Sequence, residues 1–561
     1  MKNIFYRAAW PEVRLAPWVL IGLSGAYSAH AQTPPDAGSL RQQIERDQAT
    51  PLPRQLAPEK LPLPPAMASV PGFLLSVKAF RFVGNTLLSS AQLELVLDSW
   101  LDRPVGFGEL QEAAAAVAKS YREAGWVVRA YLPQQDISDD VVTIQIVEAV
   151  FSGAVLEGSP PTRVQLDDVI ARIEALQPTG QLLNADALDR AVLLSDDLPG
   201  VSVTGALRPG QTPDSTEIAL TVTDKALISG ESTLDNTGSR ATGPLRATLG
   251  LSLNSPSGRG DLFNALVTAT DGSRYGRLAY SLPVGVQGLR VGTSVSSMLY
   301  RVITPEFSLL NSHGSSTTAG LDLTYPLVRE RMRNLYLNFA YDHKRFHNEA
   351  SLAVQSDYKV DVSSLGLSGN LYDNFGGGGA NTASLTWSSG MLNQGKLDPG
   401  ENPKLAGSFN KWRYNVSRQQ VLTDSVSFYA GYSGQRATQT LDSSEKFYLG
   451  GVSGVRAFPS SEGSGSAGQL ATVEMRTRLP NNFALTLFHD RGRVVNFDST
   501  PSYILAGSGA SFAWQSDFGI NIKFTAARRS KANPNPIASN GRDQDGSLGI
   551  TRYWLVANLA F

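Results

Sequence analysis

The chain has 561 residues, with 49 Lys and Arg against 50 Asp and Glu, and it contains no cysteine. This length exceeds one ordinary hydrophobic core, so we expect two or more domains. The balanced charge gives no support for a nucleic-acid partner, and the lack of cysteine excludes thiol nucleophiles, disulfides and thiolate metal sites.

The first 31 residues have the features of a secretory signal peptide. Basic residues precede a short apolar run over residues 16–28, and Ala29-His30-Ala31 matches the small-x-small cleavage pattern. We therefore expect residues 1–31 to be removed during export. No later apolar stretch reaches the ~20 residues that a membrane helix needs, so any membrane form of this chain must be a β-barrel.

Residues 32–49 and 50–72 predict a helix followed by a linker. The helical pattern covers residues 36–49, with Leu40 and Ile44 four apart and Ser39 as a possible cap. Its few apolar residues exclude a core helix, so we expect it to dock in a polar cavity or to stay loose. Seven prolines in residues 51–71 predict a semi-rigid linker. It is either a plain spacer or a tether that lets the helix reach a distant site.

Residues 73–149 and 150–226 share one order of elements: strand, two helices, two strands. Each copy predicts a small α+β domain, and a tandem pair favours a modular arm over an enzyme core. The first copy resembles the POTRA domain, because Phe82, Gly84 and Asn85 form an FxGN motif and residues 121–126 end its second helix in a similar YxxxGY pattern. The second copy matches this pattern only loosely.

Residues 227–561 alternate apolar and polar side chains with a period of two between Gly/Asn/Asp/Ser-rich turns. Such alternation over 335 residues (561 − 226) is typical of an outer-membrane barrel. A soluble β-sandwich would seldom continue for so long without a second core. The predicted fold is therefore α+β domains followed by a transmembrane antiparallel β-barrel.

Strand parity assigns the charges of residues 470–492 to the lumen, because a charge facing lipid near the midplane costs roughly 2–4 kcal/mol. With Val473 and Met475 facing lipid, the inward charges are Glu474, Arg476 and Arg478. The next strand turns the following residues inward: Phe488, Asp490 and Gly492.

The Gly/Ser-rich segment 450–468 carries Val455, Arg456 and Phe458, side chains that a free linker does not need. A mobile surface loop is one interpretation, and a loop folded into the barrel is the other. A cation drawn into the lumen needs a partner, because an unpaired buried charge is strongly unfavourable. Asp490 is available for this role.

The histidines predict no metal site, because His343 and His347, although four apart, lie in a segment that is predicted as strand and turn. An ordinary solvated pair is the preferred interpretation. The chain ends TRYWLVANLAF, with Tyr553 and Phe561 on the lipid-facing register. This end resembles the C-terminal signal that bacterial barrel proteins present to their assembly machinery.

In their order, these segments resemble the outer-membrane transporters of two-partner secretion, of the hemolysin secretion/activation (ShlB/FhaC/HecB) type. Residues Val455, Arg456, Ala457 and Phe458 look like the family's VRGY/F loop motif, and FHDRG at 488–492 looks like its FxDxG strand motif. Ala457 replaces the usual Gly, which reduces the backbone freedom expected there.

The resemblance implies a barrel of 16 strands in which the loop folds inward and Arg456 pairs with Asp490. It implies that residues 38–48 plug the resting pore. The POTRA domains would capture an unfolded TpsA-like exoprotein, a hemolysin or filamentous adhesin, in the periplasm for secretion, with or without its activation. Further implied partners are outer-membrane lipid or lipopolysaccharide and the barrel-assembly machinery, with no cofactor and no nucleic acid.

Three alternatives are considered at this stage. A BamA-type assembly factor also has POTRA domains and a VRGF-like loop, but it usually has more such domains and lacks the helix and tether of residues 36–71. A porin needs no periplasmic modules, and a barrel hydrolase needs a Ser/His/Asp arrangement, for which this chain has no candidate spacing. We therefore predict a translocase and not an enzyme.

Overall fold

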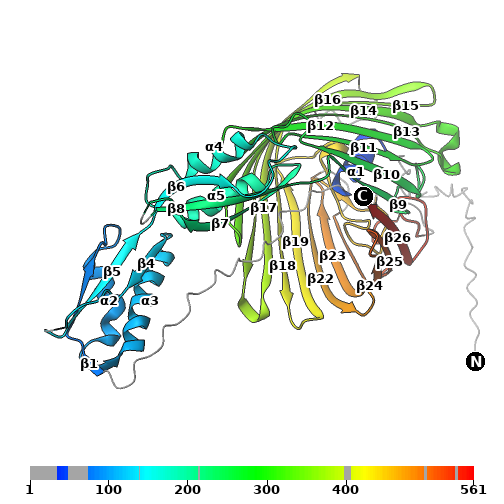
Figure 1. The fold of residues 1–561 in the computed structure, drawn as a ribbon. Helices are drawn as coiled ribbons and strands as arrows, with labels where there is room; N and C mark the ends of the chain where they lie inside the picture. Colours follow the sequence, from blue (N-terminus) through cyan, green and yellow to red (C-terminus); the bar gives the residue numbers. More distant parts are fainter. Residues whose placement is uncertain are drawn as a thin grey trace, which may run out of the picture.

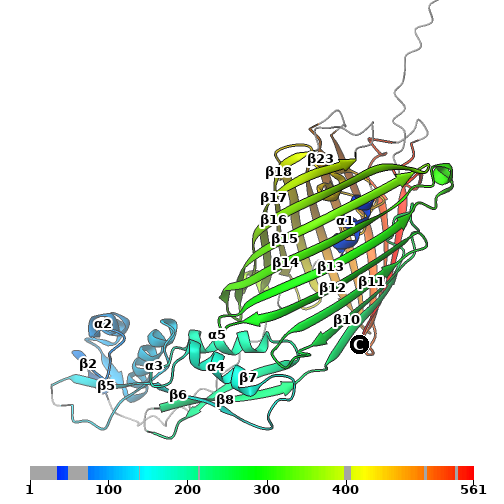
Figure 2. The same ribbon diagram turned by 90° about the horizontal axis from the view of Figure 1, so that it is seen from above.

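The computed structural model describes residues 35–47, 74–137, 139–212, 215–396, 406–460, 462–497, 502–536 and 541–561. The predicted signal peptide, residues 1–31, and the predicted linker, residues 50–72, lie outside the described residues. Two α+β domains form an arm at one end of a β-barrel, and helix α1 (Ala37–Asp47) lies inside the barrel (Figures 1 and 2). No helix among these residues is long and apolar enough to cross a membrane.

The barrel is a closed antiparallel sheet of 16 strands, as predicted. Consecutive strands pair with each other, and β9 closes the sheet against β26. The strands are β9 (Ile228–Asp235), β10 (Arg246–Asn254), β11 (Leu262–Ala269), β12 (Ser273–Val284), β13 (Leu289–Arg301), β14 (His313–Arg329), β15 (Arg333–Ala350), β16 (Ala353–Asp373), β17 (Gly379–Lys396), β18 (Gly407–Val421), β19 (Val426–Ala437), β22 (Ala467–Leu479), β23 (Phe483–Val495), β24 (Tyr503–Gln515), β25 (Ile520–Arg529) and β26 (Thr551–Ala560).

Inward and outward side chains alternate along these strands, as a period of two requires. On β22, Val473 and Met475 are exposed on the outside, whereas Glu474 between them is buried in the lumen. His343 and His347 both lie on β15, which has no turn between them, and each contacts a carboxylate, Asp361 and Glu349 respectively. The described residues contain no group of His, Cys, Asp and Glu that could hold a metal.

The first α+β domain packs two helices on a three-stranded sheet of order β2-β5-β4, and β1 pairs with β3 beside it. Its elements are β1 (Leu74–Ser76), β2 (Ala79–Val83), α2 (Ser90–Leu97), a 3-10 turn (Asp98–Trp100), β3 (Pro104–Gly106), α3 (Phe107–Glu123), β4 (Val128–Tyr131) and β5 (Val141–Glu148). The short pair of β1 and β3 is absent from the predicted pattern because three-residue strands leave no periodicity.

The second domain repeats the plan, with strand order β6-β8-β7. Its elements are β6 (Val150–Leu156), α4 (Leu166–Leu176), α5 (Ala185–Asp196), β7 (Val201–Pro209) and β8 (Ser215–Asp224). It contacts the barrel through ion pairs of 2.7 Å from Arg329 to Asp197 and from Arg331 to Asp189. The arm is therefore attached to short turns at one end of the barrel.

One carboxylate holds the same turn in both domains. Glu148 accepts hydrogen bonds from the backbone amides of Thr86 and Leu87 and from the Thr86 hydroxyl. Asp224 accepts the same set from Thr162 and Arg163, and the two threonines lie 62 residues before their carboxylates in each case. This shared geometry shows the repeat more clearly than the sequence of the second copy does.

The FxGN motif of the first domain forms the backbone before this clamped turn. Gly84 has a φ of +89°, and a Cβ there would lie 2.2 Å from the carbonyl oxygen of Ile146, so only glycine fits. Asn85 donates its side-chain amide to the carbonyl of Leu88 at 3.0 Å. Phe82 packs against the domain core, and Tyr121 donates its hydroxyl to Glu148 at 3.1 Å. Glu148 thus links both parts of the predicted motif.

Helix α1 differs from its prediction in two respects. Asp36, not Ser39, caps it, because the Asp36 carboxylate accepts the Ser39 backbone amide at 2.8 Å. The cavity around it is also not simply polar: Ala37, Leu40 and Ile44 are buried in a cluster with inward-facing apolar and aromatic side chains. These include Tyr275, Met298, Tyr300, Phe346 and Tyr358. Lumen positions were expected to be polar, and this patch departs from that pattern.

We predict that acid destabilises both α+β domains through these carboxylates. Burial alone would raise the pKa of Glu148 and of Asp224, but the hydrogen bonds from Thr86 and Leu87, and from Thr162 and Arg163, outweigh burial and hold each pKa below its ordinary value. Their stabilisation is complete above the ordinary pKa of about 4 and is lost as the pH falls through the lowered values. The protection factors of the β5 and β8 amides against hydrogen exchange, corrected for the pH dependence of the intrinsic exchange rate, should fall over that range.

Glu148→Gln provides the control for this prediction. It should remove the acid sensitivity contributed by Glu148 in β5 while leaving the response of β8 unchanged. An equal acid response of β5 in the variant and in the parent would contradict the role given to Glu148.

Candidate functional site

The centre of the lumen site is an ion pair between the loop that follows β19 and strand β23. Arg456 donates Nε to Asp490 Oδ2 at 2.8 Å and Nη2 to Asp490 Oδ1 at 2.7 Å, and its backbone amide donates to Oδ2 at 3.1 Å. Asp490 is 0% exposed and Arg456 is 6% exposed. A bidentate pair of this kind fixes orientation as well as charge.

A second carboxylate completes the neutralisation of Arg456. Glu474 of β22 contacts Nη1 of Arg456 at 2.8 Å, and it also contacts Arg476 at 2.7 Å. Arg476 lies over the ring of Tyr429, with 4.3 Å to the centroid. Thr472 donates its hydroxyl to Asp490 at 3.0 Å. Two carboxylates and two guanidinium groups therefore share one lumen cluster.

Apolar contacts hold the loop on both sides of this cluster. Val455 and Phe458 are buried, and they pack with Leu449, Phe488 and Leu505 in one core inside the barrel. The ring of Phe488 lies under the Arg456 guanidinium, 3.5 Å from its Cζ to the centroid. A cation over an aromatic face in a desolvated site contributes about 2 kcal/mol.

Two glycines on the wall provide the space for this packing. A Cβ on Gly492 of β23 would lie 2.4 Å from Leu449 Cδ2, and a Cβ on Gly507 of β24 would lie 2.4 Å from the Cβ of Ala457. Ala457 itself is not among the described residues with positive φ, so its backbone does not require glycine. The alanine that stands in the motif is therefore accommodated by Gly507 opposite it.

The loop also contacts the two strands that close the barrel. The Trp554 indole on β26 donates to the carbonyl of Arg456 at 2.8 Å, and Ser460 donates its hydroxyl to the carbonyl of Thr237, just after β9, at 3.2 Å. The pairing of β9 with β26 ends at Asp235 and Val556. The loop thus bridges the place where the closing strands separate.

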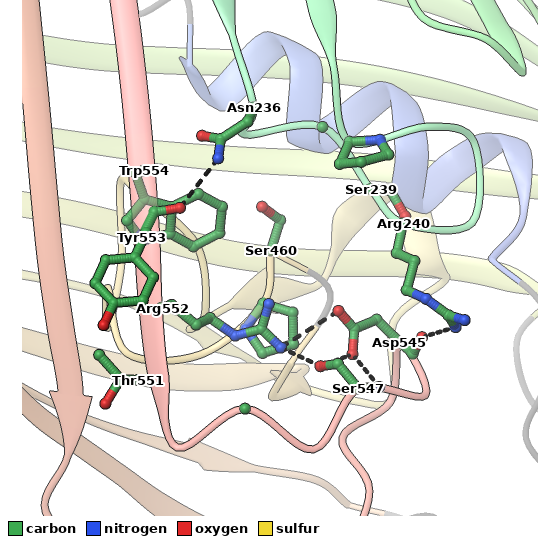
Figure 3. A pocket seen from close by; sticks show the side chains of 14 residues that line it. Asn236, Ser239, Arg240, Ser460, Asp545, Ser547, Thr551, Arg552, Tyr553 and Trp554 are labelled. Carbon is green, nitrogen blue, oxygen red and sulfur yellow. Dashed lines mark hydrogen bonds and ion pairs between the residues drawn. The ribbon is translucent and has the colours of Figure 1, made fainter.

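A cavity of about 310 Å³ lies at this separation (Figure 3). Asn236 joins the two strands beside it: its backbone amide donates to the Leu555 carbonyl at 3.2 Å, and its side chain accepts from the Leu555 amide at 2.8 Å and donates to the Tyr553 carbonyl at 3.1 Å. Arg552 points from β26 toward Asp545 and Ser547, and Arg240 contacts the Asp545 carbonyl from the β9 side. These charged and polar groups are therefore paired with one another across the cavity.

The segment between β25 and β26 covers the loop from the far end of the barrel. Glu462 of the loop accepts from Asn533 at 2.9 Å and from the Gln544 amide at 2.8 Å. Asp543, which is fully buried, pairs with Arg529 and Arg552. Arg529 lies over the Phe458 ring at 4.6 Å. The loop is therefore enclosed by strands and by this covering segment.

Helix α1 fills part of the lumen beside the loop and is bonded to it. Arg46 donates to the carbonyls of Tyr448 and Gly450 at 2.8 Å each. Near the helix start, Ser443 donates to Asp36 at 2.6 Å, and Asn348 of β15 accepts the Ala37 amide at 3.0 Å. The segment after β19 therefore holds both ends of the helix, and the wall strand β15 also holds its start.

The remaining predicted residues lie outside this cluster. Arg478 is exposed near the end of β22 closest to the arm, and its side chain forms no hydrogen bond or ion pair with the described residues. Tyr553 and Phe561 are exposed on the outer surface, and the Phe561 backbone pairs with Gly230 at 2.9 Å and 2.8 Å. Phe82, Gly84 and Asn85 lie in the first arm domain, far from the lumen.

The sequence analysis missed several contacts of the site. Trp554 could have been found, because Tyr553 and Leu555 face lipid and parity then turns the indole inward. Gly507, Glu462 and Asp543 carried no such signal, since their partners lie in other strands or loops. Glu474 was predicted as a lumen charge but not as the second partner of Arg456.

Comparison with known proteins gives two family matches. The model of the haemolysin secretion/activation proteins ShlB/FhaC/HecB matches residues 214–513, just over half of the chain, and the ShlB-type POTRA model matches residues 75–149. The heme/hemopexin transporter protein HuxB of Haemophilus influenzae is 24% identical over 543 residues, covering 91% of this chain and 94% of the relative. The outer membrane transporter CdiB of Dickeya dadantii is 25% identical over 462 residues, covering 78% and 80%.

Solved structures show the same fold. CdiB from Escherichia coli matches with a TM-score of 0.69 and 23% identity, covering 93% of this chain and 95% of that one. BamA from Haemophilus ducreyi lacking POTRA domains 1–3 matches with a TM-score of 0.51 and 15% identity, covering 87% and 100%.

We predict that Gly507→Ala displaces the loop and that Ala457→Gly reverses much of this effect. The added methyl would overlap Ala457, and overpacking costs about 1–3 kcal/mol. Because the chain lacks cysteine, a single cysteine introduced at Ser460, which is buried in the docked loop, can report loop exposure through its rate of labelling by a water-soluble maleimide. An energy of about 1–3 kcal/mol corresponds to a factor of roughly 5–150 in the exposed population.

Gly276→Ala on β12 is the matched control, because a Cβ there would meet nothing within 4 Å. Its labelling rate should equal that of the parent. If the double variant labelled as fast as Gly507→Ala alone, the contact with Ala457 would not be the cause of the displacement.

Proposed function

The chain belongs to the haemolysin secretion/activation family ShlB/FhaC/HecB, and we propose that its lumen loop and helix α1 are the two obstacles that move when it exports its partner. It is an outer-membrane translocase of two-partner secretion, with its barrel in the bacterial outer membrane and its POTRA domain in the periplasm. Residues 455–458 and 488–492 would form the loop-docking motif, and the docked Arg456–Asp490 pair is the observation that carries this proposal.

The need for movement follows from what occupies the lumen. Helix α1 and the loop are both buried inside the barrel in this structure, and a polypeptide in transit needs space of its own. The helix is held mainly by hydrogen bonds and three small or medium apolar side chains, Ala37, Leu40 and Ile44. Such a contact is modest beside a closed barrel, so we take α1 to be the element that leaves first.

The client would be a TpsA-like exoprotein, a hemolysin or an adhesin, bound unfolded by the arm. The second α+β domain would be a further POTRA domain, a role supported by the carboxylate clamp it shares with the first. Edge strands β4 and β7 offer main-chain hydrogen bonds to an extended client regardless of its side chains. We propose that folding of the client outside the cell drives its export.

Two further partners are proposed from the outer surface of the barrel. Exposed Tyr553 and Phe561 on and after the last strand would serve as the signal for the barrel-assembly machinery. The apolar outer wall would contact outer-membrane lipid and lipopolysaccharide.

Arg456→Ala should reduce export of the partner roughly tenfold or more while the barrel stays inserted. Removal of one member of a buried pair costs about 3–5 kcal/mol, because Asp490 and Glu474 would then share an uncompensated negative charge. Secreted partner in the culture medium is the measurement, with heat-modifiable gel mobility as the check on barrel folding. Arg478→Ala, which removes an unpaired lumen-side charge, should leave export unchanged.

An undiminished export by Arg456→Ala would contradict the role of the docked loop. Asp490→Asn adds a second probe, since it keeps the shape of the partner and removes its charge. We expect it to lower export in the same direction as Arg456→Ala.

Deletion of residues 36–47 should increase ion conductance several-fold in planar bilayers, because it empties the part of the lumen that α1 occupies. Arg46→Ala should produce a weaker effect, with more frequent opening, because it breaks two hydrogen bonds to the loop. Lys78→Ala in the first arm domain is the control and should not change the current. A current equal to that of the parent after the deletion would rule out the plug.

A further inference from the structure

Three arginines form a group on the outer surface of the barrel, at the end away from the arm. Arg491 and Arg493 lie on β23, where the inward position of Asp490 turns them outward, and Arg528 lies two strands away on β25. The side chains of all three are exposed, and none of these side chains forms a hydrogen bond or an ion pair with the described residues. Since the arm is periplasmic, this end of the barrel is extracellular.

The group lies at the upper boundary of the apolar wall. Below it, β23 turns Phe483, Leu485 and Leu487 outward, and β24 and β25 add Phe512 and Phe524. Arg491 follows Phe483 by eight residues, which is about 27 Å along the strand, or roughly 21 Å of height at a tilt of about 40°. An apolar band about 25 Å tall therefore places the guanidinium groups at the level of the lipid headgroups.

Only small side chains lie on the outer surface between the arginines. Strand β24 separates β23 from β25, and its outward side chains here are Ala506 and Ser508, opposite Arg491 and Arg528 respectively. The two flanking strands are about 10 Å apart at the ordinary strand spacing. A headgroup could therefore rest on β24 with cationic side chains on both sides.

The opposite part of the barrel wall provides an internal comparison. On β15 and β16 the outward cationic groups at a similar level have acidic neighbours, with His343 at 2.7 Å from Asp361 and Arg345 at 3.4 Å from Asp357. On β22–β26, by contrast, no outward carboxylate is present among the described residues. The three arginines therefore lack the acidic neighbours that the cationic side chains of β15 and β16 have. Their positive charge is available to a ligand from outside the protein.

We infer that Arg491, Arg493 and Arg528 form a binding site for the phosphate groups of lipid A in the outer leaflet. Guanidinium groups bind phosphate oxygens with two parallel hydrogen bonds, and the group lies where a phosphorylated lipid presents them. The acyl chains of the same molecule would lie against Leu487, Phe512 and Phe524 below. The site requires only the outer-membrane position of the barrel and is independent of the movement proposed for the loop.

The test uses the full-length protein in nanodiscs of phosphatidylethanolamine that contain bis-phosphorylated lipid A. Lipid A retained per barrel after detergent extraction and purification is counted by mass spectrometry. The triple variant Arg491→Ala/Arg493→Ala/Arg528→Ala should retain at least about tenfold less than the parent. Arg345→Ala/Lys359→Ala, on β15 and β16, should retain as much as the parent, and heat-modifiable mobility confirms that each barrel is folded.

Two further experiments identify the part of the lipid that is recognised. Lipid A without its phosphates should be retained no better by the parent than by the triple variant, and inorganic phosphate should not displace bound lipid A at millimolar concentration, because the acyl chains add to the contact. Equal retention of lipid A by the parent and the triple variant would overturn the inference. Retention that did not depend on the phosphates would also overturn it.

Discussion

The lumen of this barrel is organised around one buried guanidinium. Arg456 brings a full positive charge into a closed cylinder, and that charge is tolerable only because Asp490 and Glu474 meet it in the same place. The pair fixes the loop in depth and in orientation, since Asp490 holds both the side chain and the backbone amide of Arg456. With Arg456 fixed in this way, its neighbours Val455 and Phe458 are placed where they pack against the inner wall.

The docked loop also determines where helix α1 can bind. Arg46 of the helix uses the carbonyls of Tyr448 and Gly450, which are free for this purpose only while the loop keeps its folded path. Loop and helix therefore share one set of contacts in the lumen. Departure of the helix would remove these two hydrogen bonds from the loop, so the loss of the first obstacle would weaken the hold on the second.

The arm shows how a repeat can persist in geometry after its sequence signal has weakened. The FxGN pattern is recognisable in the first domain but not in the second, yet Glu148 and Asp224 clamp equivalent turns with the same three donors. Ala457 offers a similar lesson at the motif of the loop. The missing glycine predicted a constrained backbone, whereas the structure shows that the relevant space lies across the contact, at Gly507.

The sequence by itself determined the order of the modules, the closed barrel and the face on which each strand residue lies. In a strand, alternate side chains face the lumen and the others face lipid. Because a charge facing lipid is costly, Asp490 and Glu474 must belong to the lumen-facing side chains. Only the tertiary structure decided which of these groups meet Arg456, that Asp36 caps α1, and that aromatic side chains of the wall receive its apolar stripe. The physical reason is that these partners lie on strands and loops far apart in the chain, where neither periodicity nor local propensity carries information about contact.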